Sequence, residues 1–120
     1  MRRLENFVSI HPYFRIHPGR EAAFRALLPA FYRLAATEEK TLFFDFTLQG
    51  SDAFCREAYA DGESALAHIR NFRGLLAEAA KISEVARFEI HGPEAELAKL
   101  KAGLTDLRVT WFVLAAEARD

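Results

Sequence analysis

Two kinds of apolar spacing alternate along this chain, and their order limits the folds that it can adopt. Residues 7–16 alternate between apolar and polar with a period of two, which is typical of a half-buried strand. From residue 20 to residue 35 the apolar residues recur three and four positions apart, as on one face of a helix, and Pro29 inside this pattern predicts a kink. Residues 41–49 and 53–60 alternate again, and the short turn between them predicts a hairpin.

The second half of the chain predicts a similar succession of elements. Asp61 is a good N-cap for a helix, and a further helical segment follows Gly74. The pattern of residues 83–91 predicts a fourth strand. Pro93, followed closely by two acidic residues, indicates the start of another helix. The apolar run 109–116 predicts a closing strand.

The resulting order is β-α-β-β-α-β followed by an extra helix and strand, which predicts an α+β fold of the ferredoxin-like kind. A length of 120 residues suits one domain, so we expect residues 1–120 to form a single domain. One layer of helices covers only one face of such a sheet, while the other face still carries large side chains. We therefore expect a second copy of the chain to cover that face, forming a homodimer.

Composition and charge exclude several classes of protein. Apolar residues make up 51% of the chain and charged residues 28%, which excludes a disordered segment. Sixteen basic and seventeen acidic residues give a net charge of −1, and the third strand lacks the signature of RNA-binding modules, so we expect no nucleic-acid partner. No apolar run approaches the roughly 20 residues that span a bilayer, and no signal-peptide pattern is present. We expect a cytoplasmic protein that does not bind membranes.

The sequence offers no anchor for a metal or a nucleotide. His11 and His17 lie on the same predicted strand, but six residues at about 3.3 Å each separate them by roughly 20 Å, too far for one ion. There is no glycine-rich dinucleotide fingerprint and no phosphate-binding loop. The single cysteine, Cys55, excludes an intrachain disulfide. We therefore expect neither a metal nor a cofactor.

Three stretches resemble the antibiotic-biosynthesis monooxygenase-like family, whose members are dimeric α+β barrels. Residues 12–20, Pro-Tyr-Phe-Arg-Ile-His-Pro-Gly-Arg, are similar to the family's opening strand and the start of its first helix. Glu39 lies where the family usually carries a glutamate before the second strand. Residues 56–61, Arg-Glu-Ala-Tyr-Ala-Asp, and the later His68 are similar to a strand-ending Glu-x-Tyr/Trp, an acidic cap and a helical histidine. The chain departs from the family in lacking a tryptophan near Tyr59.

The resemblance implies a cofactor-independent monooxygenase, an oxidoreductase acting on a small hydroxylated aromatic such as a quinol. In this reading His68 is the preferred catalytic base and Glu57 is an orienting group or an alternative base. Tyr59 and His11 would bind the substrate. The missing tryptophan argues against haem degradation, which some relatives perform.

Each of these residues also has a purely structural interpretation. His68 would then be a partly buried histidine with satisfied hydrogen bonds, and Glu57 would pair across strands with Arg15 or Arg56. Tyr59 would be a packing residue with its hydroxyl group hydrogen-bonded. The matching alternative for the whole chain is a non-enzymatic, dimeric protein that binds a small ligand or a partner.

Overall fold

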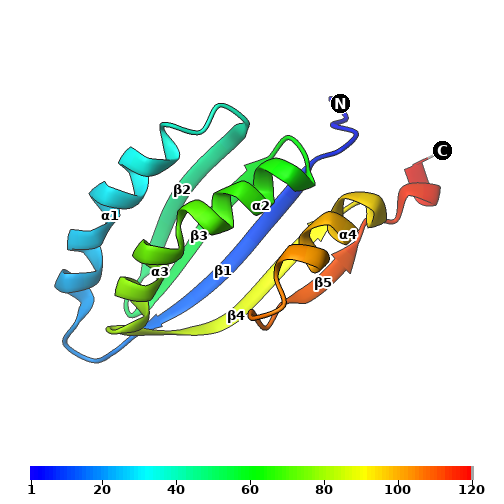
Figure 1. The fold of residues 1–120 in the computed structure, drawn as a ribbon. Helices are drawn as coiled ribbons and strands as arrows, with labels where there is room; N and C mark the ends of the chain where they lie inside the picture. The colour runs from blue at the N-terminus through cyan, green and yellow to red at the C-terminus, as the bar shows by residue number, and fades with distance from the viewer. Residues whose placement is uncertain (120) are drawn as a thin grey trace.

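The chain folds into one sheet with all its longer helices on the same face (Figure 1). This computed structural model describes residues 1–119. In chain order the elements are β1 (Val8–Ile16), α1 (Glu21–Ala35), β2 (Thr41–Gln49), β3 (Asp52–Tyr59), α2 (Gly62–Asn71), α3 (Arg73–Ala80), β4 (Ser83–Gly92), α4 (Glu94–Gly103), β5 (Thr110–Val113) and the 3₁₀ helix η1 (Ala116–Arg119). This order confirms the predicted α+β, ferredoxin-like arrangement with an additional helix and strand at its end.

Within residues 1–119 the sheet has five strands, in the order β2-β3-β1-β4-β5. All neighbouring strands are antiparallel except β4 and β5, which run parallel. The hairpin between β2 and β3 turns at Gly50, whose φ of 59° lies in the left-handed region that glycine adopts without strain. In the middle of the sheet Ile10 of β1 pairs with Glu57 of β3 and with Ile90 of β4. The backbone of Glu57 is therefore held between neighbouring strands in the centre of the sheet.

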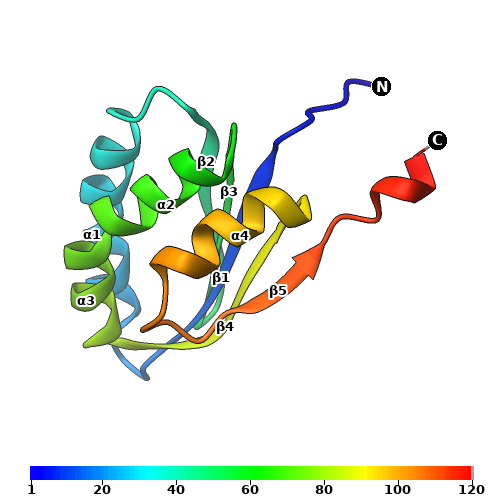
Figure 2. The same cartoon turned by 45° about the vertical axis from the view of Figure 1, so that its right-hand side comes forward.

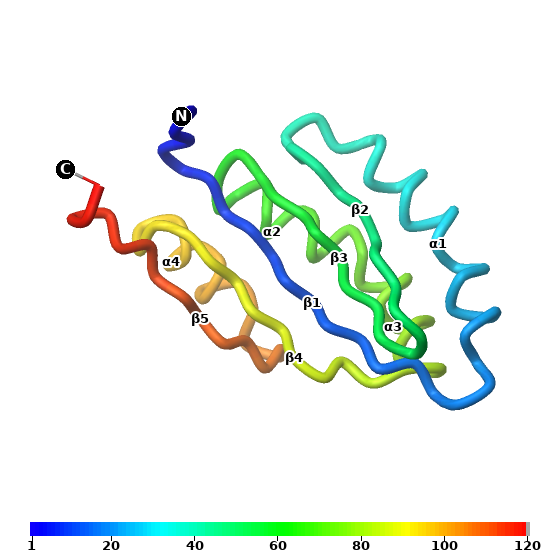
Figure 3. The backbone as a smooth tube through the Cα atoms, turned by 180° about the vertical axis from the view of Figure 1, so that it is seen from behind, coloured from blue at the N-terminus to red at the C-terminus, as the bar shows by residue number. Residues whose placement is uncertain are grey.

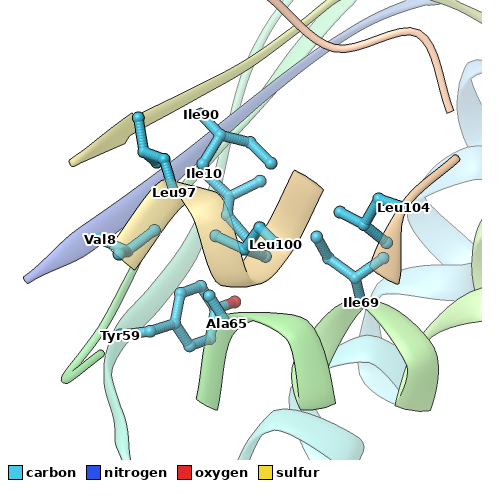
Figure 4. Packing of buried hydrophobic residues seen from close by; sticks show 9 residues of the cluster. All are labelled: Val8, Ile10, Tyr59, Ala65, Ile69, Ile90, Leu97, Leu100 and Leu104. Carbon is cyan, nitrogen blue, oxygen red and sulfur yellow. The ribbon is translucent and has the colours of Figure 1, made fainter. Parts of the chain in front are cut away.

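The helices form a layer on one side of the sheet (Figure 2), and two apolar clusters lie between the two layers. One cluster joins β1, β3 and β4 to α2 and α4, with Leu97 and Leu100 of α4 packed against Ile10 and Ile90 of the sheet (Figure 4). The other cluster lies under α1 and α3 and is rich in phenylalanine.

Among residues 1–119, none of the helices combines the length and the apolar character that a membrane-spanning helix needs.

The last strand is shorter than predicted. The sequence pattern extends it over residues 109–116, whereas β5 covers only Thr110–Val113 and the chain then forms η1. Among the described residues its neighbour in the sheet is β4, which ends at Gly92, and the Gly92 carbonyl oxygen accepts a final hydrogen bond from the Leu114 N–H at 2.8 Å. Beyond that point residues 1–119 offer no further strand to pair with, so apolar character alone cannot extend the ladder.

The second face of the sheet carries no helix in the part of the chain that the structure describes, as the view from behind shows (Figure 3). A row of rings, which we call the aromatic row, crosses this face. It consists of Phe112, His91, His11, Phe54 and Tyr13. Successive ring centroids lie 4.4, 4.4, 6.0 and 4.6 Å apart. Phe112 at the end of the row is 42% exposed and the other four rings are half-buried, so the row meets solvent in the single chain.

Candidate functional site

The start of α2 holds His68 in place. The Asp61 carboxylate accepts a hydrogen bond from the Ser64 N–H at 2.8 Å, and the Ser64 hydroxyl accepts one from the Asp61 N–H at 3.2 Å. These hydrogen bonds lower the pKa of Asp61 and fix the first turn of the helix. Ala65 and Ile69 then face the core, and His68 lies between them in sequence on the buried side, with only 4% of its surface exposed.

The His68 ring lies between two carboxylates. Its Nδ1 is 2.8 Å from Oε1 of Glu38, and its Nε2 is 3.1 Å from Oε1 of Glu57. The same Glu57 oxygen accepts a hydrogen bond from the Tyr59 hydroxyl at 2.7 Å. Glu57, His68 and Glu38 thus form a continuous buried chain of acid, base and acid, which we call the carboxylate–imidazole chain.

The remaining bonds of Glu38 hold the outer end of this chain. Its Oε1 also accepts a hydrogen bond from the Thr41 hydroxyl at 3.0 Å, and its Oε2 accepts one from the Asn71 amide at 3.2 Å. The glutamate therefore ties the segment after α1 to β2 and α2. Removing it would loosen the position of the histidine as well as change its charge.

The two carboxylates decide the charge of His68. Burial lowers the pKa of His68, but hydrogen bonds and charge from Glu57, and then from Glu38, outweigh this effect and raise it above its ordinary value. Carboxylate oxygens beside both nitrogens favour the protonated ring, in which both nitrogens are N–H donors. Burial and the nearby Glu57 carboxylate raise the pKa of Tyr59, so its hydroxyl group remains a donor.

An apolar pocket, which we call the inner pocket, lies beside this chain. Glu57, His68 and Cys55 contribute its polar groups. Its apolar wall includes Phe14, Phe31, Phe44, Phe46, Phe72 and Phe88. Phe72 stacks on the His68 ring with 4.0 Å between centroids, and burial raises the pKa of the Cys55 thiol, which keeps it neutral. The volume of about 20 Å³ holds roughly one water molecule.

The structure brings three of the four predicted site residues together. His68, Glu57 and Tyr59 are in direct contact. His11 lies on the opposite face of the sheet, because it alternates along β1 with the inward-facing Ile10. There its Nε2 is 2.7 Å from the Ser9 hydroxyl, and burial together with the neighbouring His91 lowers its pKa. Within one chain, His11 cannot touch a ligand bound beside His68.

The structural alternative for Glu57 is wrong. Arg15 forms its ion pair with Asp52 instead, at 3.6 Å. Arg56 is the neighbour of Glu57 along β3 and therefore points to the other face of the sheet. Glu57 is 5% exposed and takes its partners from the helix side.

Glu38 was missed by the sequence analysis, which assigned the family's glutamate to Glu39. Glu39 is exposed, whereas the Glu38 side chain is 16% exposed and bonded to His68. The two acids are adjacent, and only the position at which α1 ends decides which of them turns inward. Ala35 is the last helical residue, and its carbonyl oxygen accepts a hydrogen bond from the Glu38 N–H at 3.0 Å, which sets the direction of the segment.

The arrangement suits proton transfer better than metal binding. Glu38 and Glu57 bond to opposite nitrogens of one imidazole, so their oxygens flank the ring and do not converge on a common point. Within residues 1–119 no group of three or more histidine, cysteine, aspartate or glutamate side chains is placed to hold an ion. The carboxylate–imidazole chain can accept a proton at Glu57, and the neighbouring His68 can compensate the change in charge.

The comparisons with known proteins agree with the fold. No family profile matches the chain, and no curated protein matches it. The crystal structure of MupZ from Pseudomonas fluorescens is 32% identical, has a TM-score of 0.86 and is matched over 92% of this chain and 91% of MupZ.

Candidate antibiotic biosynthesis monooxygenases of known structure share the fold at lower identity. The one from Nitrosomonas europaea has 15% identity and a TM-score of 0.66, with 78% of this chain and 96% of that chain covered. The one from Caulobacter crescentus has 17% identity and a TM-score of 0.64, with 72% and 89% covered. From the identity to MupZ over nearly its whole length, and from the fold shared with these proteins, the chain belongs to the antibiotic-biosynthesis monooxygenase-like family.

Proposed function

We propose that this protein is a cofactor-independent monooxygenase that acts on a small hydroxylated aromatic, such as a quinol or naphthol. The observation that carries the proposal is the carboxylate–imidazole chain, whose Glu57 and His68 line a pocket walled by phenylalanine rings. An aromatic substrate suits that wall, and its hydroxyl group suits a carboxylate acceptor.

Glu57 is the base in this proposal. Both nitrogens of His68 are occupied by carboxylates, so the ring has no free lone pair to accept a proton. Glu57 accepts the phenolic proton, and the imidazolium of His68 stabilises the charges on either side of the transfer. Tyr59 orients the Glu57 carboxylate through its hydroxyl group.

The oxidation that follows needs only dioxygen. The phenolate forms a C–O bond to dioxygen at a ring carbon and gives a hydroperoxide once a proton returns from Glu57. Loss of the ring C–H proton then breaks the O–O bond, leaves a quinone carbonyl and releases the second oxygen atom as water. One dioxygen thus takes four electrons from one substrate molecule. The apolar wall keeps bulk water away from the peroxide.

Oxygen uptake tests this proposal directly. Purified protein is mixed with a panel of quinols and naphthols under air, and an oxygen electrode records consumption beside the quinone absorbance. We expect one dioxygen per quinone and a rate at least about 100-fold lower for Glu57→Gln, the usual cost of losing a general base. Glu39→Gln is the matched control, because Glu39 is exposed and outside the site. Equal rates for Glu57→Gln and the unmodified protein would refute the assignment.

The size of the inner pocket favours a second candidate, a protein that binds a ligand without converting it. A volume of about 20 Å³ admits no aromatic ring unless side chains of the wall move. Saturable binding of the same quinols, measured by calorimetry, without oxygen uptake in any buffer, would support this candidate over the enzyme.

We also propose that the aromatic row is the contact surface of a homodimer. Phe112 at one end of the row is 42% exposed, and no helix of residues 1–119 covers this face. Light scattering at micromolar concentration should give about 27 kDa, twice the 13.6 kDa of one chain. Phe112→Asp places a charge in that contact and should shift the mass towards one chain. A monomeric unmodified protein would contradict the proposal.

A further inference from the structure

A second, larger hollow lies next to the inner pocket on the helix side of the sheet. It runs between α3, the segment 85–89 of β4 and the segment 107–110 before β5. We call it the outer groove. Its volume of about 510 Å³ lies within the range of sites that hold drug-sized ligands, whereas the inner pocket holds about one water molecule. A ligand larger than a water molecule therefore needs more volume near Glu57 than the inner pocket offers.

The two hollows share a wall. Phe14, Ile69, Leu76 and Phe88 line both of them. Phe14 and Ile69 are 3% and 2% exposed and are held in the core, but Leu76 and Phe88 are only half-buried. Rotation of Leu76 and Phe88 would join the outer groove to the inner pocket without disturbing the core. The groove would then give a ligand a route from solvent to Glu57.

The charged residues of the groove favour one anionic group. Three arginines, Arg73, Arg87 and Arg108, line it, but the Arg87 guanidinium lies 4.1 Å from the Tyr13 ring centroid, on the other face of the sheet. Arg73 bonds to Asp106 at 2.7 Å, and Arg87 lies 3.5 Å from Glu89. Arg108 forms no ion pair with any residue from 1 to 119. The groove is otherwise mainly apolar, so its charge is completed by a single negative group on an apolar ligand.

We propose that the outer groove binds the body of an elongated, largely apolar substrate that carries one anionic group, held by Arg108. The hydroxylated aromatic end of this molecule displaces Leu76 and Phe88 and reaches Glu57, a step that rests on the function proposed above. The chemistry selects an amphipathic phenol with a carboxylate or similar anion at the far end of an aliphatic chain. A single small ring would fill only part of this combined site.

The test measures binding by calorimetry under argon, where no oxidation takes place. The probes are 8-(4-hydroxyphenyl)octanoate, its methyl ester and 4-ethylphenol, which separate the contributions of charge and chain length. We expect the octanoate to bind about threefold to tenfold more tightly than the ester, as for one hydrogen-bonded ion pair near the surface, and the short phenol to bind most weakly. Arg108→Gln should remove the preference for the octanoate over the ester.

Blocking the groove gives an independent measurement. Ala77 is exposed on α3 and lines the outer groove but not the inner pocket, so Ala77→Phe fills the groove without touching the core. We expect at least a tenfold loss of octanoate affinity, while 4-ethylphenol binds as before. Ala26→Phe, at an exposed position of α1 away from both hollows, is the matched control and should change neither.

Two results would overturn the proposal: equal affinity for the octanoate and its ester, or undiminished octanoate binding by Ala77→Phe. These outcomes are distinct from a failure of the proposed function. Oxygen uptake with short quinols and no preference for the octanoate would support the monooxygenase function and refute the groove as a binding site. Selective binding of the octanoate without oxygen uptake would support the groove as a binding site and refute the monooxygenase function.

Discussion

Replacement of Glu38 by glutamine tests the charge balance of the site in one step. The amide keeps the size of the side chain and one acceptor oxygen for the Nδ1–H of His68, but it removes the negative charge. The carboxylate currently accepts hydrogen bonds from three groups, on His68, Thr41 and Asn71. With one carboxylate gone, only Glu57 holds the pKa of His68 up against burial, so that pKa should fall.

The expected loss of stability follows from the strength of the hydrogen bonds whose acceptor loses its charge. A hydrogen bond to a charged group contributes about 1.5–3 kcal/mol and a neutral one about 0.5–1.5 kcal/mol. Converting the His68 bond, with weaker losses at Thr41 and Asn71, should lower the free energy of unfolding by about 1–3 kcal/mol at pH 6. The Glu38 side chain is only 16% exposed, so solvent screens little of this loss.

The sign of the pH dependence is set by His68. Its pKa in the folded protein is raised above the ordinary value of 6.5. Its contribution to stability is therefore fully present below pH 6.5 and is lost as the pH rises through the folded pKa, with a slope of at most about 1.4 kcal/mol per pH unit. The difference between Glu38→Gln and the unmodified protein should accordingly be largest near pH 6 and shrink in alkali.

Urea unfolding monitored by circular dichroism from pH 6 to pH 10 measures this difference. Glu39→Gln is the control, since it removes the same charge from the adjacent, exposed position. We expect it to change the free energy of unfolding by less than about 0.5 kcal/mol at every pH. A loss for Glu38→Gln that is independent of pH, or an equal loss for Glu39→Gln, would refute the role given to Glu38.

Two further substitutions, and a third that serves as a control, test the contacts around the site and of the helix that carries it. Tyr59→Phe removes the donor to the Glu57 carboxylate and should cost about 1.5–3 kcal/mol in urea unfolding; a loss below about 0.5 kcal/mol would mean that this hydrogen bond contributes little. Gly62→Ala places a methyl group against the backbone carbonyl oxygen of Glu96, where α2 meets α4, and should lower the unfolding free energy by about 1–3 kcal/mol or more. Gly74→Ala, with no atom within 4 Å of the added carbon, should leave thermal stability unchanged or raise it, and a matching loss at both glycines would contradict the close contact.

Local patterns were enough to predict most of the fold. Period-two alternation identified β1 to β4 because each of these strands has one face against helices and one face without them. The N-cap at Asp61 was predicted because its hydrogen bonds are made within four residues. The end of β5 was not predictable in this way, because it depends on where β4 stops, and Gly92 is 21 residues earlier than Val113.

For the site, too, the local contacts were predictable from the sequence and the long-range ones were not. Glu57 and Tyr59 were placed on one face because they are two residues apart on a strand, and His68 was directed inward by its helical spacing. These are local inferences, and the structure brings the three residues into contact. His11 was grouped with them through the resemblance alone, although the alternation along β1 already directs it away from the face that Ile10 shares with the helices.

The choice of base shows why residue type is a weak guide to chemistry. Histidine is favoured as a base by its ordinary pKa near neutrality. That reasoning holds for a ring with one free nitrogen, and here Glu38 occupies the nitrogen that would otherwise be free. A contact between residues 30 positions apart thus occupies the second nitrogen of His68 and favours its protonated form. Among these groups, Glu57 is left as the one that borders the inner pocket and has oxygens that can accept a proton.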